Sequence, residues 1–207
     1  MKINSKALCF VLLAAVFSSC ASGKKFKGST KVDRVDASTV TDLSGYWNDT
    51  DVRLVSDDLC AQCLNAPWYK EFSDATGEKP VIIVGTFRNQ SDEHIDTTII
   101  SQKIEASLVN SRKVSAVANS AGRGELREER NDQQVNSSAE TAKMLQNETA
   151  ADYMLQGSVK TVVDSVDNKM TRTYFVSAEL VNIETNEKVW LGDNSAIKKQ
   201  ITTKKFR

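Results

Sequence analysis

The residues of this chain best suited to chemistry are Cys60 and Cys63, which lie three positions apart in the segment CAQC. In an exported protein, such a pair can be a redox couple, a structural disulfide or half of a metal site. Redox enzymes place the first cysteine at the N-terminus of a helix, where the helix dipole stabilises the thiolate. Here the pair falls near the end of a predicted helix. We therefore favour plain helix packing, with a disulfide and a thiol-disulfide enzyme as alternatives.

The histidine and the acidic residues give no second catalytic pattern. The one histidine, His94, lies in the polar loop RNQSDEHID at residues 88–96, and a zinc-type site would need further ligands beside the cysteines. No serine or cysteine motif near His94 indicates a triad, and no two acidic residues stand out as an acid–base pair. We therefore predict no catalytic residue, no metal, no cofactor and no small-molecule substrate.

The charge of the chain is balanced, with 27 Lys and Arg residues against 27 Asp and Glu residues. Nucleic-acid binding requires clustered basic charge that neutralises phosphates. The composition therefore predicts no nucleic-acid partner. Two prolines and nine glycines also argue against a long disordered stalk.

The first twenty residues have the pattern of an export signal. Two lysines precede an apolar run at residues 7–17, and two serines then precede Cys20. The run is far shorter than the roughly 20 residues that a membrane span needs. The serines and Cys20 resemble a bacterial lipobox, although Phe17 stands where leucine is usual. This pattern predicts cleavage before Cys20 and lipidation of that residue; the alternative is an ordinary secretory signal with a chance cysteine.

Four segments follow from these signals. Residues 1–19 are predicted to be a lipoprotein signal peptide, and residues 20–42 the lipidated N-terminus with a flexible linker. Residues 43–200 are predicted to form one α/β domain, and residues 201–207 a solvated basic tail. No aspartate follows Cys20 as an inner-membrane retention signal, so we expect an anchor in the outer membrane that faces the periplasm.

Helical periodicity marks the first part of the domain. A helix capped by Asn48 or Asp49 and ended by Pro67 has one apolar face. That face consists of Val52, Val55, Leu59 and Cys63. A buried strand is predicted at residues 80–87 and a short one at residues 113–117. Between them, Asp96 caps a helix that buries Ile100, Ile104 and Leu108.

The remaining part is predicted to turn from helix to strand. Residues 119–136 are predicted to form either a solvated helix or a mobile segment, and Ser137 with Glu140 matches the capping box of another helix. Alternating segments then predict three strands, at residues 151–163, 173–182 and 187–199. Asn186 is predicted to be left-handed in the last hairpin turn. The simplest arrangement is one mixed sheet with helices packed on both faces.

Five segments of the chain, taken in order, resemble the LpoB family. They are DLSGYWNDTDVRLV, VIIVGTFRNQSDEHIDTTIISQKIEASLVNSRKV, REERNDQQ, AADYMLQGSV and LVNIETNEKVWLG, spread over residues 40–198. The chain departs from the family pattern at Ala150 and Asn186, where glycine is common. The resemblance implies a fold like the N-terminal domain of TolB, with helices on both faces of a mixed sheet.

The resemblance further implies an outer-membrane lipoprotein that binds and activates a class A penicillin-binding protein, which is a peptidoglycan synthase. We expect the partner-binding surface either in the loop that carries Arg88, Asn89 and His94 or beside Trp68, because exposed tryptophans often anchor interfaces. The alternative for Trp68 is that its ring covers the core between helix and sheet. The alternative is an envelope assembly or secretion lipoprotein related to the curli-pore protein. A pore would need additional long strands, for which one domain leaves little length.

Overall fold

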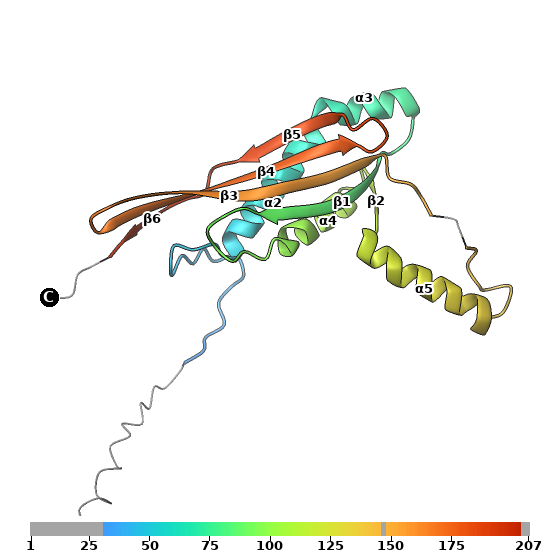
Figure 1. The fold of residues 1–207 in the computed structure, drawn as a ribbon, viewed down its shortest axis with the longest axis horizontal. Helices are drawn as coiled ribbons and strands as arrows, with labels where there is room; N and C mark the ends of the chain where they lie inside the picture. The colour runs from blue at the N-terminus through green and yellow to red at the C-terminus, as the bar shows by residue number, and fades with distance from the viewer. Residues whose placement is uncertain (1–30, 146–147, 204–207) are drawn as a thin grey trace, which may run out of the picture. The chain divides into compact units, whose positions relative to one another are not determined.

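The computed structural model describes residues 31–145 and 148–203. The chain divides into two compact units, Met1–Ala37 and Ser38–Arg207. The described residues of the first unit, 31–37, contain no helix or strand. The predicted signal peptide, Cys20 and residues 204–207 of the predicted tail lie outside the described residues, so the fold below is that of the second unit (Figure 1).

Helix α2 (Asp49–Asn65) begins where the capping residue predicts. The Asn48 side chain accepts a hydrogen bond from the Asp51 amide at 3.2 Å, and the Asp51 carboxylate accepts one from the Asn48 amide at 2.9 Å. This reciprocal capping box satisfies two amides that a helix start otherwise leaves unpaired. The predicted apolar face is confirmed, because all four of its residues are buried.

A second helix, α3 (Pro67–Thr76), was not predicted. Pro67 ends α2, as expected, but it also occupies the first turn of α3, where the missing amide of proline costs nothing. Gly77 closes α3 in the left-handed conformation, with φ of 71°. The proline therefore marks a corner between two helices.

Strand β1 (Val81–Asn89) and helix α4 (Thr98–Ser111) follow in the predicted order, and β2 (Ser115–Val117) comes next. The three predicted core residues of α4 are completely buried: Ile100, Ile104 and Leu108. Their spacing of four places them on one side of the helix. They pack against the sheet.

The C-terminal part supplies strands β3 (Tyr153–Val166), β4 (Lys169–Asn182), β5 (Lys188–Asn194) and β6 (Lys198–Thr202). The sheet order is β2-β1-β3-β4-β5, with β6 paired to β4. The pairs of β1 are parallel and the other pairs are antiparallel. Asn186 is left-handed with φ of 61°, as predicted. Strand β6 corrects the prediction that this end of the chain is only solvated.

Helix α5 (Ser120–Asn136) has no buried residue, in agreement with its predicted solvated character. The predicted helix from Ser137 is wrong, because residues 137–145 form turns and irregular backbone. A capping box starts a helix only where an apolar face can follow. Here Met144 and Leu145 are both exposed.

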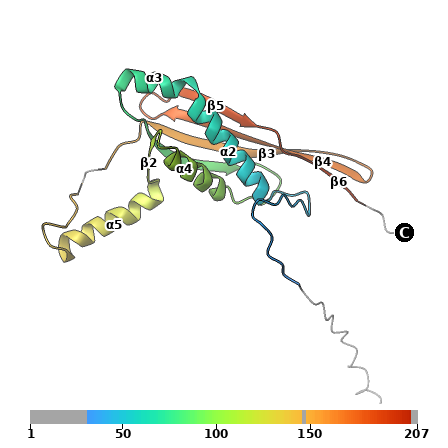
Figure 2. The ribbon, with the colours of Figure 1, turned by 180° about the vertical axis from the view of Figure 1, so that it is seen from behind.

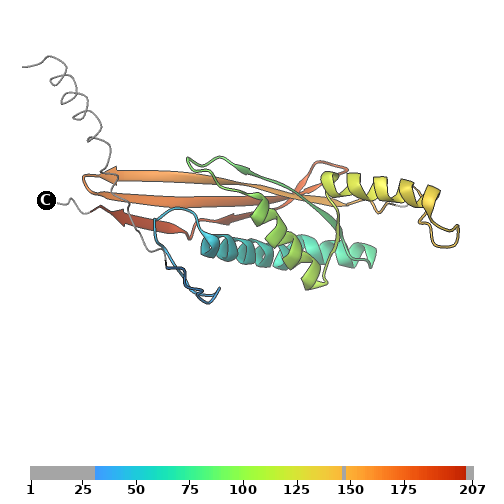
Figure 3. The ribbon, with the colours of Figure 1, turned by 90° about the horizontal axis from the view of Figure 1, so that it is seen from below.

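The predicted class, one mixed sheet with helices, is confirmed. Its layers differ from the prediction in one respect: α2 and α4 pack together on the same face of the sheet (Figure 3). On the other face, β3 and β4 present Gln156, Ser158, Ser177 and Glu179. An antiparallel sheet can leave one face to solvent, and α5 lacks the apolar residues needed to cover it.

Gly157 gives a direct test of this packing. A Cβ atom at this position would lie 2.4 Å from the Phe87 ring and 2.4 Å from the Ser177 carbonyl oxygen. We expect Gly157→Ala to lower the free energy of unfolding by about 1–3 kcal/mol, because the strands must separate. Urea denaturation would measure the change. Gly124→Ala in α5 is the matched control, since no atom lies within 4 Å of the added methyl; an equal loss in both variants would contradict the packing.

Candidate functional site

The loop between β1 and α4, at residues 90–97, is held rigidly by its own polar groups. The Asn89 side chain donates to the Glu93 carbonyl at 2.7 Å and accepts from the Ser91 amide at 3.0 Å. Ile95 is buried in the core. The adjacent His94 therefore projects into solvent between two inward residues, Glu93 and Ile95.

Glu93 binds the loop to the sheet. Its carboxylate pairs with Arg172 of β4 and accepts a hydrogen bond from the Tyr174 hydroxyl at 2.5 Å. The Glu93 and Arg172 side chains are only 9% and 6% exposed. We call Glu93, Arg172 and Tyr174 the clamp. It joins positions that are about 80 residues apart in the chain, and such a buried pair is costly to break from one side.

The surroundings of the clamp favour the donor states of Tyr174 and Arg172. Burial raises the pKa of the Tyr174 hydroxyl, and the Glu93 carboxylate raises it further. Burial alone would lower the pKa of Arg172, but the bond with Tyr174 and the charges of Glu93 and Asp92 raise it overall. The phenol therefore stays protonated as a donor, and the guanidinium stays charged.

The segment entering the domain, residues 42–47, rests on the same clamp. We call it the strap. The Trp47 amide donates to Glu93 at 3.0 Å, and the Trp47 ring lies 5.1 Å from the Tyr174 ring. The Tyr46 ring lies 4.8 Å from the Arg172 guanidinium, within the range of a cation–π contact. The loop and the strap therefore share one buried carboxylate.

Lys199 of β6 fixes the strap from its other side. Its ammonium bonds to Asp51 at 2.6 Å, to Asp42 at 2.8 Å and to the Tyr46 carbonyl at 2.8 Å. Burial alone would lower the pKa of Lys199, but the carboxylates of Asp42 and Asp51 raise it. The sequence predicted Lys199 as the last residue of a strand near the end of the domain, with no structural role of its own. Its 9% exposure shows that it is structural.

Local sequence patterns did not predict the clamp, although the position of Arg172 indicated that it needs a partner. Arg172 is two residues before Tyr174 in a strand whose alternate residues are apolar and inward. A charged residue at an inward position is almost never buried without a partner. That partner, Glu93, lies in a loop far away in sequence, so its identity could not be read from local spacing.

The four predicted partner-binding residues have different surroundings. Arg88 and His94 are exposed. Asn89 is also exposed, but its side chain organises the loop. Trp68 lies in the core with 4% exposure, and its indole donates to the Cys63 carbonyl at 2.8 Å. The expectation that Trp68 is an exposed anchor is therefore wrong, because its ring packs against Tyr153.

Cys60 and Cys63 are free and buried inside α2. Burial raises the pKa of the Cys60 thiol, and it raises the pKa of the Cys63 thiol to about 12. Reactive cysteines require the opposite change, a lowered pKa in an accessible place. The pair therefore acts as core packing in this structure, and the predicted disulfide alternative is not formed.

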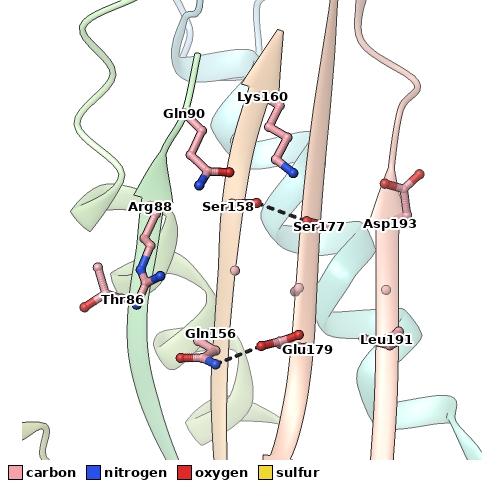
Figure 4. Close-up of a pocket in the computed structure, with 13 residues that line it drawn as sticks. Thr86, Arg88, Gln90, Gln156, Ser158, Lys160, Ser177, Glu179, Leu191 and Asp193 are labelled. Atoms are coloured by element: carbon pink, nitrogen blue, oxygen red, sulfur yellow. Dashed lines mark hydrogen bonds between the residues drawn. The ribbon is translucent and has the colours of Figure 1, made fainter. Parts of the chain in front are cut away.

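The open face of the sheet carries a shallow depression of about 510 Å³ (Figure 4). Side chains of β1, β3, β4 and β5 point into it. They include Arg88, Gln156, Lys160, Glu179 and Asp193. Gln156 donates to Glu179 at 2.8 Å, and Ser158 and Ser177 are 3.2 Å apart. The lining mixes both charges with neutral polar groups, which is typical of a solvated surface rather than a site for one ion.

Residues 31–145 and 148–203 contain no group of three or more His, Cys, Asp or Glu residues placed to hold a metal ion. Within the same ranges, no helix has the length and apolar character needed to cross a membrane.

Comparison with known proteins gives one family. The model of the peptidoglycan-synthase activator LpoB family matches residues 51–196. The matched region runs from the first turn of α2 to the end of β5, so it includes the loop and the clamp. No curated protein matches the chain.

The solved structures similar to this chain include three of LpoB. The LpoB C-terminal domain from Salmonella enterica is 17% identical over 63% of this chain and 93% of that chain, with a TM-score of 0.35. The LpoB C-terminal domain from Escherichia coli is 18% identical over 61% and 90%, with a TM-score of 0.36. The NMR structure of E. coli LpoB is 12% identical over 84% and 85%, with a TM-score of 0.38.

The burial of the cysteines predicts their reactivity. At pH 8, Cys60 and Cys63 should react with a maleimide many times more slowly in native protein than in unfolded protein, because both thiols are buried and protonated. In 6 M guanidinium without reductant, both should be labelled, as mass spectrometry would show. Rapid labelling of Cys60 or Cys63 in native protein, or no labelling of them after unfolding, would contradict buried free thiols. Either result would favour the redox or disulfide alternative.

The burial of the clamp predicts its contribution to stability. Arg172→Met should lower the free energy of unfolding by about 3–5 kcal/mol, because it leaves Glu93 buried without its cation. Combining it with Glu93→Gln should recover part of that loss. The control is Lys188→Met at an exposed pair with Glu179, where less than about 1 kcal/mol is expected. Equal losses in the two single variants would show that the clamp contributes no more than a surface pair.

Proposed function

We propose that this chain, which belongs to the LpoB family of peptidoglycan-synthase activators, binds and activates a class A penicillin-binding protein in the periplasm. The observation that carries the proposal is the family match over residues 51–196, which spans the loop, the clamp and most of the sheet. An activator of another enzyme needs a binding surface and no catalytic site. We accordingly propose that the chain has no catalytic activity, cofactor, small-molecule substrate or nucleic-acid partner.

We further propose that lipidated Cys20 anchors the protein in the outer membrane after removal of residues 1–19. Residues 20–42 would then be the tether, residues 43–200 the regulatory domain and residues 201–207 its basic end. Several acyl chains give lasting attachment, since each buried methylene contributes about 0.8 kcal/mol. The tether would enter the domain at the strap.

The proposed docking surface is the loop around His94 together with the neighbouring Arg88. Both side chains are exposed, and Glu93 and Ile95, which flank His94, hold its backbone in place. A loop that is already ordered loses less conformational entropy on binding. Asn89 supports this surface by ordering the loop from within. Trp68 is not part of it.

Activation requires that the domain bind two states of the synthase with different affinity. A ligand shifts a conformational equilibrium only by its differential affinity for the two states. A rigid loop suits this purpose because it fits one arrangement of the partner better than another. The clamp would thus contribute indirectly, by holding His94 in place.

Recovery of the partner tests the proposed function. Tagged full-length protein from briefly cross-linked, detergent-solubilised cells should recover a class A penicillin-binding protein, and Cys20→Ser should reduce or abolish that recovery. Recovery of secretion components, or of no cell-wall enzyme from well-expressed bait, would overturn the proposal.

Binding of the purified proteins tests the surface. Arg88→Ala combined with His94→Ala should weaken affinity for the synthase about tenfold, or about 1.4 kcal/mol. Lys79→Ala, at an exposed lysine outside the loop, should leave it unchanged. Equal affinities of the double variant and this control would exclude the loop as the docking surface.

A further inference from the structure

Strands β3 and β4 form an arm that extends past the rest of the sheet (Figures 1 and 2). Strand β4 pairs with β3 along its whole length, to Val166, whereas the pairing of β1 with β3 ends at Val159. On the opposite side of the arm, β6 covers β4. In the described part of the chain, no strand pairs with the outer edge of β3 beyond Val159. We call residues 161–166 the free edge.

The backbone groups of the free edge can be assigned by alternation. The Gln90 amide donates to the Val159 carbonyl at 2.8 Å, so the backbone of Val159 faces β1. Every second residue of a strand faces the same side. Thr161, Val163 and Ser165 therefore direct their amides and carbonyls away from β4. The loop reaches only the first of them, where the Thr161 hydroxyl donates to Asp92 at 2.6 Å.

The outer edge of β1, unlike that of β3, is protected by side chains. There the Thr97 hydroxyl donates to the Phe87 carbonyl at 2.5 Å, and the Ser101 hydroxyl approaches the Gly85 carbonyl at 3.4 Å. Thr97, just before α4, and Ser101 of α4 thus cap that edge. Proteins usually protect edges in such ways, because an open edge is a template for another strand. Among the residues that the structure describes, none caps the free edge of β3 in this way between Val163 and Val166.

The side chains of the free edge are also exposed enough to contact an added strand. Val162 and Val166 are 57% and 68% exposed on the open face of the sheet, and Val163 is 41% exposed on the opposite face. Asp164 lies between the two open-face valines. A strand added here would therefore meet apolar groups on both faces and one carboxylate.

A second copy of this chain does not fit this pattern. Two copies related by a twofold axis would align their free edges antiparallel. Full overlap of residues 162–166 then sets Asp164 opposite Asp164 of the second copy, and like charges directly opposite are destabilising. If the second copy were shifted along the free edge toward β1, it would collide with Gln90 and Asp92. These residues already contact Val159 and Thr161. The charge therefore favours a different chain with a basic residue opposite Asp164.

We propose that the free edge of β3 accepts an extended segment of the synthase by strand addition, with apolar residues beside Val162 and Val166 and a Lys or Arg beside Asp164. This inference rests on the proposed function and names the way in which the partner binds. Main-chain hydrogen bonds to Val163 and Ser165 supply affinity, and the side chains supply specificity. The free edge continues from the proposed docking loop, since Asp92 contacts Thr161.

Proline substitution tests strand addition directly. Val163→Pro and Ser165→Pro each remove an outward amide and leave the hydrogen bonds between β3 and β4 in place, so edge positions tolerate them. Each should weaken the binding of full-length protein to the purified class A penicillin-binding protein at least tenfold. Val163→Thr retains the amide and the branched side chain, and it should bind within twofold of the natural chain. Asp164→Lys should also weaken binding. Thermal unfolding of every variant would confirm that the fold is retained.

The outcomes separate this inference from the proposed function. If the natural chain binds the synthase and the folded proline variants bind equally well, strand addition is wrong and the activator function stands. If the natural chain binds no class A synthase, both fail. If sedimentation shows a dimer that Val163→Pro dissolves, the free edge belongs to a second copy and the synthase is excluded from it.

Discussion

Two buried cations on neighbouring strands set the main electrostatic constraint on this domain. Arg172 of β4 and Lys199 of β6 stand directly opposite each other, and both side chains are almost completely removed from water. Two like charges in this position require anions from elsewhere in the chain. Glu93 and Asp92 come from the loop, and Asp42 and Asp51 come from the strap and α2. The need to neutralise the pair therefore draws three distant segments to the base of the arm.

This arrangement links three places that the proposed function needs. The strap is where a lipid tether would enter, the loop is the proposed docking surface, and the arm carries the free edge. All three include or contact the clamp or Lys199, and bonds to these buried side chains fix their relative positions. A regulator that carried its binding surface on a loosely held loop would lose affinity to conformational entropy.

The sequence predicted those parts of the fold that rest on local patterns. Periodic apolar residues gave α2 and α4, alternation gave β3 and β4, and Asn186 gave the last turn. The errors arose where the local pattern was compatible with two outcomes. Pro67 ends one helix and starts another, and the capping box at Ser137 has no apolar face behind it. The prediction that helices cover both faces of the sheet was wrong. Whether the second face is covered depends on α5, and α5 has too few apolar residues to pack there, so that face stays open.

The site was less predictable than the fold, for a physical reason. Helices and strands arise from neighbours in sequence, whereas the clamp joins Glu93 to Arg172 across most of the domain. Exposure is equally non-local: Trp68 is buried in the core, where Tyr153 of the distant strand β3 packs against its indole, whereas His94 stays exposed. Buried charge is therefore the most useful signal to carry from such a sequence. An arginine at an inward strand position requires an acidic partner, and the segment that supplies that partner becomes an ordered part of the surface.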